Sequence, residues 1–134
     1  MLARAMFGLA LSLGRLGRAH EAVAEHRAAL AIAEARLGAS HPAVAAGAHG
    51  LAQALRRAGD FTGARDALRQ ALRISERAQG KEHPDTWITR FELARMEVDC
   101  GDFDGFARME AASARLCALL GADHPTVLAT RRWL

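Results

Sequence analysis

The chain repeats itself at an interval of 42 residues, and such an internal repeat restricts the possible fold more strongly than composition does. Residues 8–32 (GLALSLGRLGRAHEAVAEHRAALAI) align with residues 50–74 (GLAQALRRAGDFTGARDALRQALRI), and residues 92–116 form a third copy. The matched columns hold apolar and small side chains, such as Leu51 and Leu93. We therefore expect similar structural units that stack and share one core.

Each unit has the pattern of two helices. In the second unit, apolar residues recur at helical spacing from Val44 to Leu55, and the segment RAGDF at residues 57–61 interrupts the pattern. Gly59 in this segment can adopt the left-handed conformation that ends a helix. The composition agrees, since the apolar half of the chain is rich in alanine and leucine and contains no tyrosine. We predict an all-α solenoid of three helix hairpins plus a partial seventh helix.

Three His-Pro pairs, at residues 41–42, 83–84 and 124–125, mark the boundaries between units. Proline suits the first helical turn, where its missing N–H has no partner to lose. A polar residue ahead of it, or the histidine itself, can cap the exposed amides. As metal ligands the histidines would have to meet, yet successive units lie at least ~8–10 Å apart, whereas zinc–nitrogen bonds measure about 2.0 Å. We interpret the pairs as helix starts and predict no metal site.

The repeat predicts a single domain over residues 1–134, with units at about 1–40, 41–82 and 83–123 and a partial unit at 124–134. The last segment, TVLATRRWL, begins a helix and then stops, so we expect the chain to be a piece of a longer array. Four apolar side chains there would lack a covering helix, and they predict self-association through the C-terminal helix. These are Val127, Leu128, Trp133 and Leu134.

The string of LAxxL at residues 51–55 and GDF at 59–61, followed by Ala64, Leu68, Ala71, Leu72 and Ile74, resembles the tetratricopeptide repeat. The long period, with LGxxHP between units, is similar to the kinesin-light-chain type, which also occurs in bacterial, especially actinomycete, signalling proteins. The resemblance covers nearly the whole chain. It implies a right-handed superhelix whose inner groove binds a protein or peptide.

Three departures from the pattern concern the third unit and the ligand. Glu97 occupies the column of Leu55, and one residue is missing between Phe103 and the last His-Pro pair. Depending on where that gap falls, Gly105 or Phe106 takes the small-residue column of Ala64. The asparagine that precedes the Leu-Ala pair in this subtype, and that commonly contacts ligand backbone, is replaced by Gly8, Gly50 and Glu92.

No arrangement of residues in the sequence predicts catalysis. The serines lack the strand–turn–helix context of a hydrolase nucleophile, and GRLGRAH lacks the Gly-Lys-Ser/Thr of a phosphate loop. The histidines outside the His-Pro pairs form no ligand pair at i, i+4 spacing. We therefore predict a protein that is not an enzyme, with no catalytic residue and no cofactor.

The first helix of each unit is expected to line the inner groove. Its side chains form an apolar strip with arginines beside it, and arginine forks suit carboxylates, so an acidic peptide is the expected ligand class. The alternative is a merely solvated helix face. The residues placed in the groove are Arg4, Phe7, Leu11, Arg15, His49, Gln53, Arg56, Arg57, Ile88, Phe91, Arg95 and Asp99.

The charge of the chain restricts the classes of partner it can bind, and its cysteines indicate the cellular compartment. The calculated pI is 9.6, but residues 83–123 carry eight acidic and four basic residues and interrupt any basic stripe, so nucleic-acid binding is not expected. No run approaches the ~18 apolar residues of a membrane span, and the opening MLARAMFGLALSLG fits the repeat better than a secretory signal. Cys100 and Cys117 would lie ~20 Å apart along a helix, so reduced thiols in a cytoplasm are expected.

The sequence therefore predicts a non-catalytic interaction module that binds a peptide or partner segment in its groove. One alternative is an architectural or sensor arm of a larger bacterial regulator of the nucleotide-switched ATPase type, whose groove would fold back on its own chain. Self-association is the other alternative.

Overall fold

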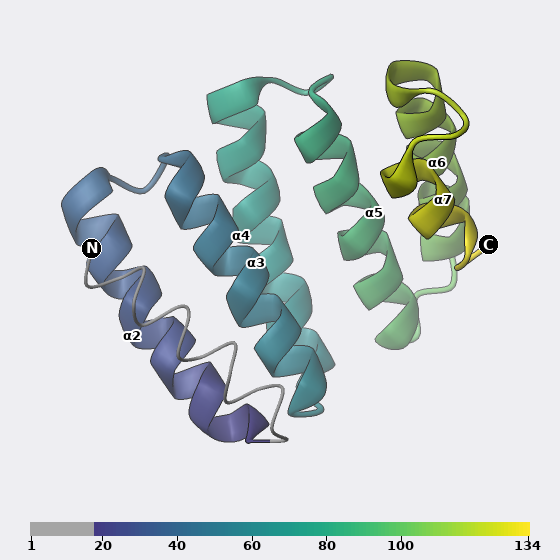
Figure 1. Ribbon diagram of the computed structural model, residues 1–134. Coiled ribbons are helices and arrows are strands. Elements are labelled where there is room, and N and C mark those ends of the chain that lie inside the picture. The colour runs from purple at the N-terminus through teal and green to yellow at the C-terminus, as the bar shows by residue number, and fades with distance from the viewer. Residues whose placement is uncertain (1–17) are drawn as a thin grey trace.

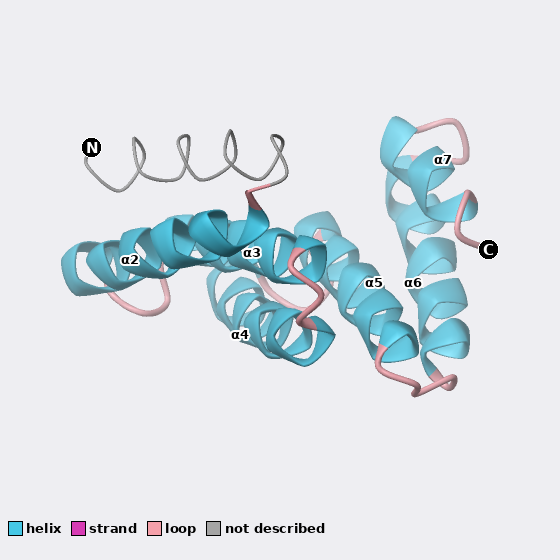
Figure 2. Cartoon of the chain, turned by 90° about the horizontal axis from the view of Figure 1, so that it is seen from below, coloured by secondary structure: helices cyan, strands magenta, loops and turns pink. Residues whose placement is uncertain are grey.

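The computed structural model describes residues 18–134, which form six α-helices and no strand. Neighbouring helices run antiparallel and pack as successive hairpins (Figures 1 and 2). The predicted all-α solenoid is confirmed for these residues, whereas the helix predicted at the start of the first unit lies outside them. The helices are α2 (Ala19–Leu37), α3 (Pro42–Arg57), α4 (Phe61–Gln79), α5 (Pro84–Asp99), α6 (Gly105–Leu120) and α7 (Pro125–Arg131).

The His-Pro pairs start helices α3, α5 and α7, as predicted. Each proline is the first helical residue, and the preceding histidine has an extended backbone. The imidazole Nδ1 of His41, His83 and His124 accepts a hydrogen bond of 3.0–3.1 Å from the backbone N–H two residues later. The histidine itself is therefore the cap, and it satisfies an amide that the helix leaves without a partner.

The turns inside the second and third hairpins each contain a glycine with a positive φ, Gly59 and Gly101. Gly59 has a φ of 86° and follows the last turn of α3, where its N–H donates to the carbonyl of Arg56. Only glycine adopts such a φ without strain. The predicted helix end at Gly59 is confirmed, and the next residue, Asp60, caps α4 through a 2.8 Å bond from the N–H of Gly63 to its Oδ1.

One column of the core comes from equivalent positions on the second helix of each unit. Leu68 on α4 is 2 % exposed, and Met109 on α6 takes the same place. On α2 this column holds His26, which is also 2 % exposed and packs its ring against Gly50 on α3. A titratable side chain therefore occupies a position that the other two units fill with a large apolar residue.

Burial lowers the pKa of His26, because the charged imidazolium is disfavoured away from water. Below about pH 6.5 the unfolded chain would bind a proton more readily than the folded chain, so stability should fall as the pH drops from 7 towards 5. In the variant His26→Leu, which copies the leucine of α4, this loss should become smaller. Chemical denaturation at several pH values measures it. His20→Gln, at an exposed position of the same helix, should keep the wild-type slope, and an unchanged slope in His26→Leu would contradict the assignment.

The one-residue gap of the third unit falls before Gly105. Helix α6 begins at Gly105, which is buried, and has 16 residues. Helix α4 begins at Phe61 and has 19 residues, three more than α6. Phe103 and Phe106 are 69 % and 48 % exposed. Gly105 therefore takes the small-residue column of Ala64, and Phe106 does not.

Glu97 replaces a core leucine without leaving a buried charge unpaired. Its side chain is 15 % exposed, and its Oε2 lies 3.3 Å from Nη2 of Arg108 on α6 and 3.9 Å from Nη2 of Arg69 on α4. Arg108 also pairs with Asp102 at 2.9 Å. The carboxylate thus joins the two helices that pack on either side of α5.

Helix α7 closes the described array. Val127 is fully buried, contrary to the expectation that it lacks cover, and Thr130 bonds Ser113 on α6 at 2.8 Å. Leu128, Trp133 and Leu134 are about half exposed, at 45–55 %. Within residues 18–134 no helix is both long and apolar enough to pass through a membrane.

Candidate interaction surface on helices α3 and α5

Helices α3 and α5 run in the same direction, with α4 returning in the opposite direction (Figure 1). Their facing side chains form a surface that we call the α3–α5 face. His49 joins the two helices at its centre: its Nε2 lies 2.9 Å from Oγ1 of Thr89, and its Nδ1 lies 3.0 Å from Oε2 of Glu92. Thr89 in turn donates to the carbonyl of Asp85. This polar bridge fixes the spacing between units two and three.

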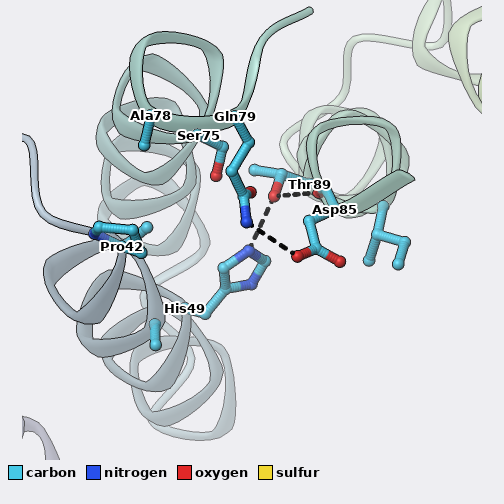
Figure 3. A pocket seen from close by; sticks show the side chains of 10 residues that line it. Pro42, His49, Ser75, Ala78, Gln79, Asp85 and Thr89 are labelled. Carbon is cyan, nitrogen blue, oxygen red and sulfur yellow. Dashed lines mark hydrogen bonds between the residues drawn. The ribbon is translucent and has the colours of Figure 1, made fainter. Parts of the chain in front are cut away.

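An open pocket of about 240 Å³ lies at the amino-terminal end of the α3–α5 face. Pro42 and His49 of α3 form one side and Asp85 and Thr89 of α5 the other, while the carboxyl-terminal end of α4 closes the third side with Ser75, Ala78 and Gln79 (Figure 3). The Nε2 of Gln79 donates to Oδ2 of Asp85 at 3.2 Å. The polar side chains therefore converge on a pocket whose remaining walls are mainly alanine and Ile88.

Two arginines lie side by side further along the same face. Arg56 of α3 and Arg95 of α5 border a narrow gap with Gln53 and Glu92, and Arg56 donates to Oε1 of Gln53 at 3.3 Å. Burial lowers the pKa of Arg95, and the neighbouring positive charge of Arg56 lowers it further. Arg95 nevertheless stays charged at neutral pH, because an arginine pKa stays far above 7.

The Nε atoms of Arg56 and Arg95 are buried and have no hydrogen-bond partner among the described residues. The guanidinium of Arg95 also stacks on the ring of Trp133, 4.5 Å from its centroid. Guanidinium groups can present several donors to one carboxylate. The arrangement thus offers two close, partly accessible cations, although their buried Nε atoms are out of reach of a ligand.

Eleven of the twelve residues predicted for the groove fall into three groups. His49, Gln53, Arg56 and Arg95 lie together on the α3–α5 face, with Ile88 at the pocket. Arg57 and Asp99 are exposed at the carboxyl-terminal ends of α3 and α5. The four predicted residues of the first unit, Arg4, Phe7, Leu11 and Arg15, lie outside the described residues.

Phe91 corrects the prediction, because it does not reach the surface. Its side chain is 4 % exposed and packs in a cluster with Ala94, Met109 and Ala112. The 42-residue repeat places Phe91 in the column of His49. A polar side chain at that column bridges to the next unit, whereas a large apolar one is driven into the core. The repeat period therefore showed that Phe91 is equivalent to His49, but it could not show how deeply the Phe91 side chain is buried.

Four residues of the face were missed by the sequence reasoning. Thr89, Glu92 and Asp85 reach it because they occupy the same side of α5 as Ile88 and Arg95, a helical spacing that could have identified them. Trp133 reaches Arg95 from beyond the end of α7, and no local pattern indicates this. Its position depends on how α7 packs.

Among residues 18–134 no group of three or more histidine, cysteine or acidic side chains could hold a metal ion. Cys100 and Cys117 are both free thiols. The α3–α5 face thus contains charged and hydrogen-bonding groups suited to recognition. The Thr89 hydroxyl beside His49 is 1 % exposed and donates to the carbonyl of Asp85, so a substrate could not reach it.

The chain is similar in sequence and in fold to tetratricopeptide repeat proteins. A profile described as "Tetratricopeptide repeat" matches residues 1–77 and 48–105. Among curated proteins, none matches this chain in sequence. Two crystal structures of a Podosopora anserina protein described as kinesin-light-chain-like, with nearly identical TPR-like repeats, are 29 % identical to it and superpose with TM-scores of 0.85 and 0.86.

The matched region is 98 % of this chain but only 63 % and 62 % of those two chains. BtubC (BKLC) from P. vanneervenii shares the fold, with 19 % identity, a TM-score of 0.75 and coverage of 98 % of this chain and 56 % of its own. The chain therefore spans less than two thirds of the length of these solved proteins. On the profile match, which covers more than half of its residues, the chain belongs to the tetratricopeptide repeat family.

Proposed function

We propose that this chain is a non-catalytic interaction module that binds an acidic peptide segment along the α3–α5 face. The observation that carries the proposal is the pair Arg56 and Arg95, two partly accessible guanidinium groups that border the same gap on the face. Two like charges held together in a partly buried place repel each other, and the nearby carboxylates Glu92 and Asp99 offset this only in part, since the pKa of Arg95 remains lowered. A carboxylate from a partner could contact both guanidinium groups.

A peptide is the form of anion that best suits the surface. The face extends along both helices for about ten residues from Ala46 to Arg56, which corresponds to ~15 Å of helix axis. A small acid would contact only the end of the face that contains Arg56 and Arg95. An extended chain of four to five residues covers the same distance at ~3.3 Å per residue, so one segment can contact the pocket, His49 and the arginines together.

Selection of peptides from a random twelve-residue phage library on the wild-type protein provides the probe for a test. Binding of the selected peptides is then measured by fluorescence anisotropy. Arg56→Glu should weaken binding at least tenfold, because it replaces an attractive charge by a repulsive one. Arg77→Glu makes the same charge change at an exposed position of α4, away from the face, and should leave binding within about twofold. Equal affinity of the wild type and Arg56→Glu would overturn the proposal.

An alternative role is that of an arm in a longer cytoplasmic regulator, with this chain one part of the array. Support comes from the solved relatives, which extend beyond the matched region, and from the half-exposed Leu128, Trp133 and Leu134 at α7. A following helix, or a second copy of this chain, would cover them. Analytical ultracentrifugation distinguishes these two kinds of cover. A concentration-dependent dimer that Leu128→Glu abolishes favours self-association. A monomer at all concentrations contradicts self-association.

A further inference from the structure

The pocket at the amino-terminal end of the α3–α5 face differs in charge from the arginine end. Among residues 18–134, Asp85 is the only carboxylate that lines it, and no lysine or arginine of these residues does. Both ring nitrogens of His49 already have close neighbours, Oγ1 of Thr89 and Oε2 of Glu92. The pocket therefore presents a negative group at one end of a face whose other end is positive.

The acceptor groups of the pocket are arranged around an apolar floor. Gln79 directs its NH₂ group to Oδ2 of Asp85, so its carbonyl oxygen keeps its full acceptor capacity. A carboxylate has about four acceptor sites, and Asp85, whose side chain is 60 % exposed, is accessible from the pocket (Figure 3). Ala45, Ala46 and Ile88 supply apolar surface beside these groups. This combination suits a side chain with an aliphatic stem and a cationic end.

We propose that this pocket takes the side chain of an arginine or lysine from the peptide segment whose acidic residue contacts Arg56 and Arg95. The inference rests on the proposed function, since it assigns the second contact of the same ligand. The stem would lie on Ala46 and Ile88, and the charged end would donate to Asp85 and to the carbonyl oxygen of Gln79. The cavity of about 240 Å³ is large enough for one such side chain and too small for a folded partner.

The spacing of the two ends defines a pattern in the ligand. Asp85 and Arg95 are ten residues apart on α5, so they are separated by ~15 Å along the helix. An extended peptide covers this distance in four to five residues. The ligand should therefore carry a basic and an acidic residue four to five positions apart, and reversing their order would require the peptide to bind in the opposite direction.

Two small probes test the two ends separately by NMR on the labelled full chain. Acetyl-arginine amide should shift the methyl signals of Ala46 and Ile88, and acetyl-glutamate amide should shift the side-chain Nε–H signals of Arg56 and Arg95. Asp85→Asn should weaken binding of the arginine probe about three- to fivefold, as expected for an accessible ion pair. Asp66→Asn, which removes an acid of similar exposure (63 %) on α4 outside the pocket lining, should leave it unchanged.

Ala46→Leu supplies a second variant, because Ala46 is exposed and a leucine there fills the pocket without altering the core. It should abolish the arginine signal and keep the glutamate signal. An arginine probe that binds Asp85→Asn and Ala46→Leu as well as the wild type, or that shifts no pocket signal, would overturn the pocket assignment. An arginine signal at the pocket without a glutamate signal at Arg56 and Arg95 would instead contradict the acidic-peptide proposal and support the pocket.

Discussion

Phe91→Ala is expected to lower the free energy of unfolding by about 3–5 kcal/mol, the range for removing a buried phenylalanine. The ring is 4 % exposed and packs with Ala94 on its own helix and with Met109 and Ala112 on α6. Truncation would leave a cavity between α5 and α6 that neither helix can close without losing other contacts. Urea denaturation followed by circular dichroism measures the change.

Phe103→Ala is the matched control, since it removes the same atoms from a ring that is 69 % exposed. Its effect should stay within about 0.5 kcal/mol. If the two variants proved equally stable, Phe91 would not be a core residue and would again be a candidate residue of the binding surface. The expected result also means that loss of binding in Phe91→Ala would report loss of structure, whereas Arg56→Glu tests the α3–α5 face directly.

Gly105→Ala is expected to destabilise the protein by about 1–3 kcal/mol, although alanine is the better helix former. A methyl group at Gly105 would lie 2.6 Å from the carbonyl oxygen of Ala94 and 2.7 Å from Cγ2 of Val98 on α5. The carbonyl belongs to the helix backbone and cannot rotate aside as a long side chain can. Helices α5 and α6 would therefore have to move apart, which thermal unfolding should detect as a lower Tm.

Phe106→Ala distinguishes the two possible registers of the third unit. With Gly105 in the packed column, the half-exposed Phe106 contributes little, and its truncation should cost less than about 1 kcal/mol. With Phe106 in that column, its truncation would be the more damaging of the two. A larger loss of stability in Phe106→Ala than in Gly105→Ala would contradict the register described here.

Much of the fold could be predicted because it depends on local chemistry. A proline at the first helical position, a histidine that caps the amide two residues later, and a glycine with a φ of 86° act within a few residues of chain. Because these residues recur in each repeat unit, the helix boundaries could be predicted in each unit. Stacking follows as well, because an isolated hairpin would leave its apolar face in water.

The candidate site could be predicted only in part. Helical spacing brought His49, Gln53, Arg56 and Arg95 to one face, and the structure places them together. It did not separate Phe91, which lies at the same column as His49, from the residues that stay accessible. Spacing along a helix specifies a direction, and the neighbouring helices determine whether a side chain in that direction meets solvent or core.

The sequence by itself determined the class of fold and the helix starts at the His-Pro pairs, because each depends on short-range geometry repeated along the chain, and its motifs indicated the family. Only the tertiary structure decided that Gly105 and not Phe106 packs against α5, that Glu97 is paired by arginines from two helices, and that Trp133 lies over Arg95. Those outcomes depend on distances between helices, which packing sets and which no local pattern contains.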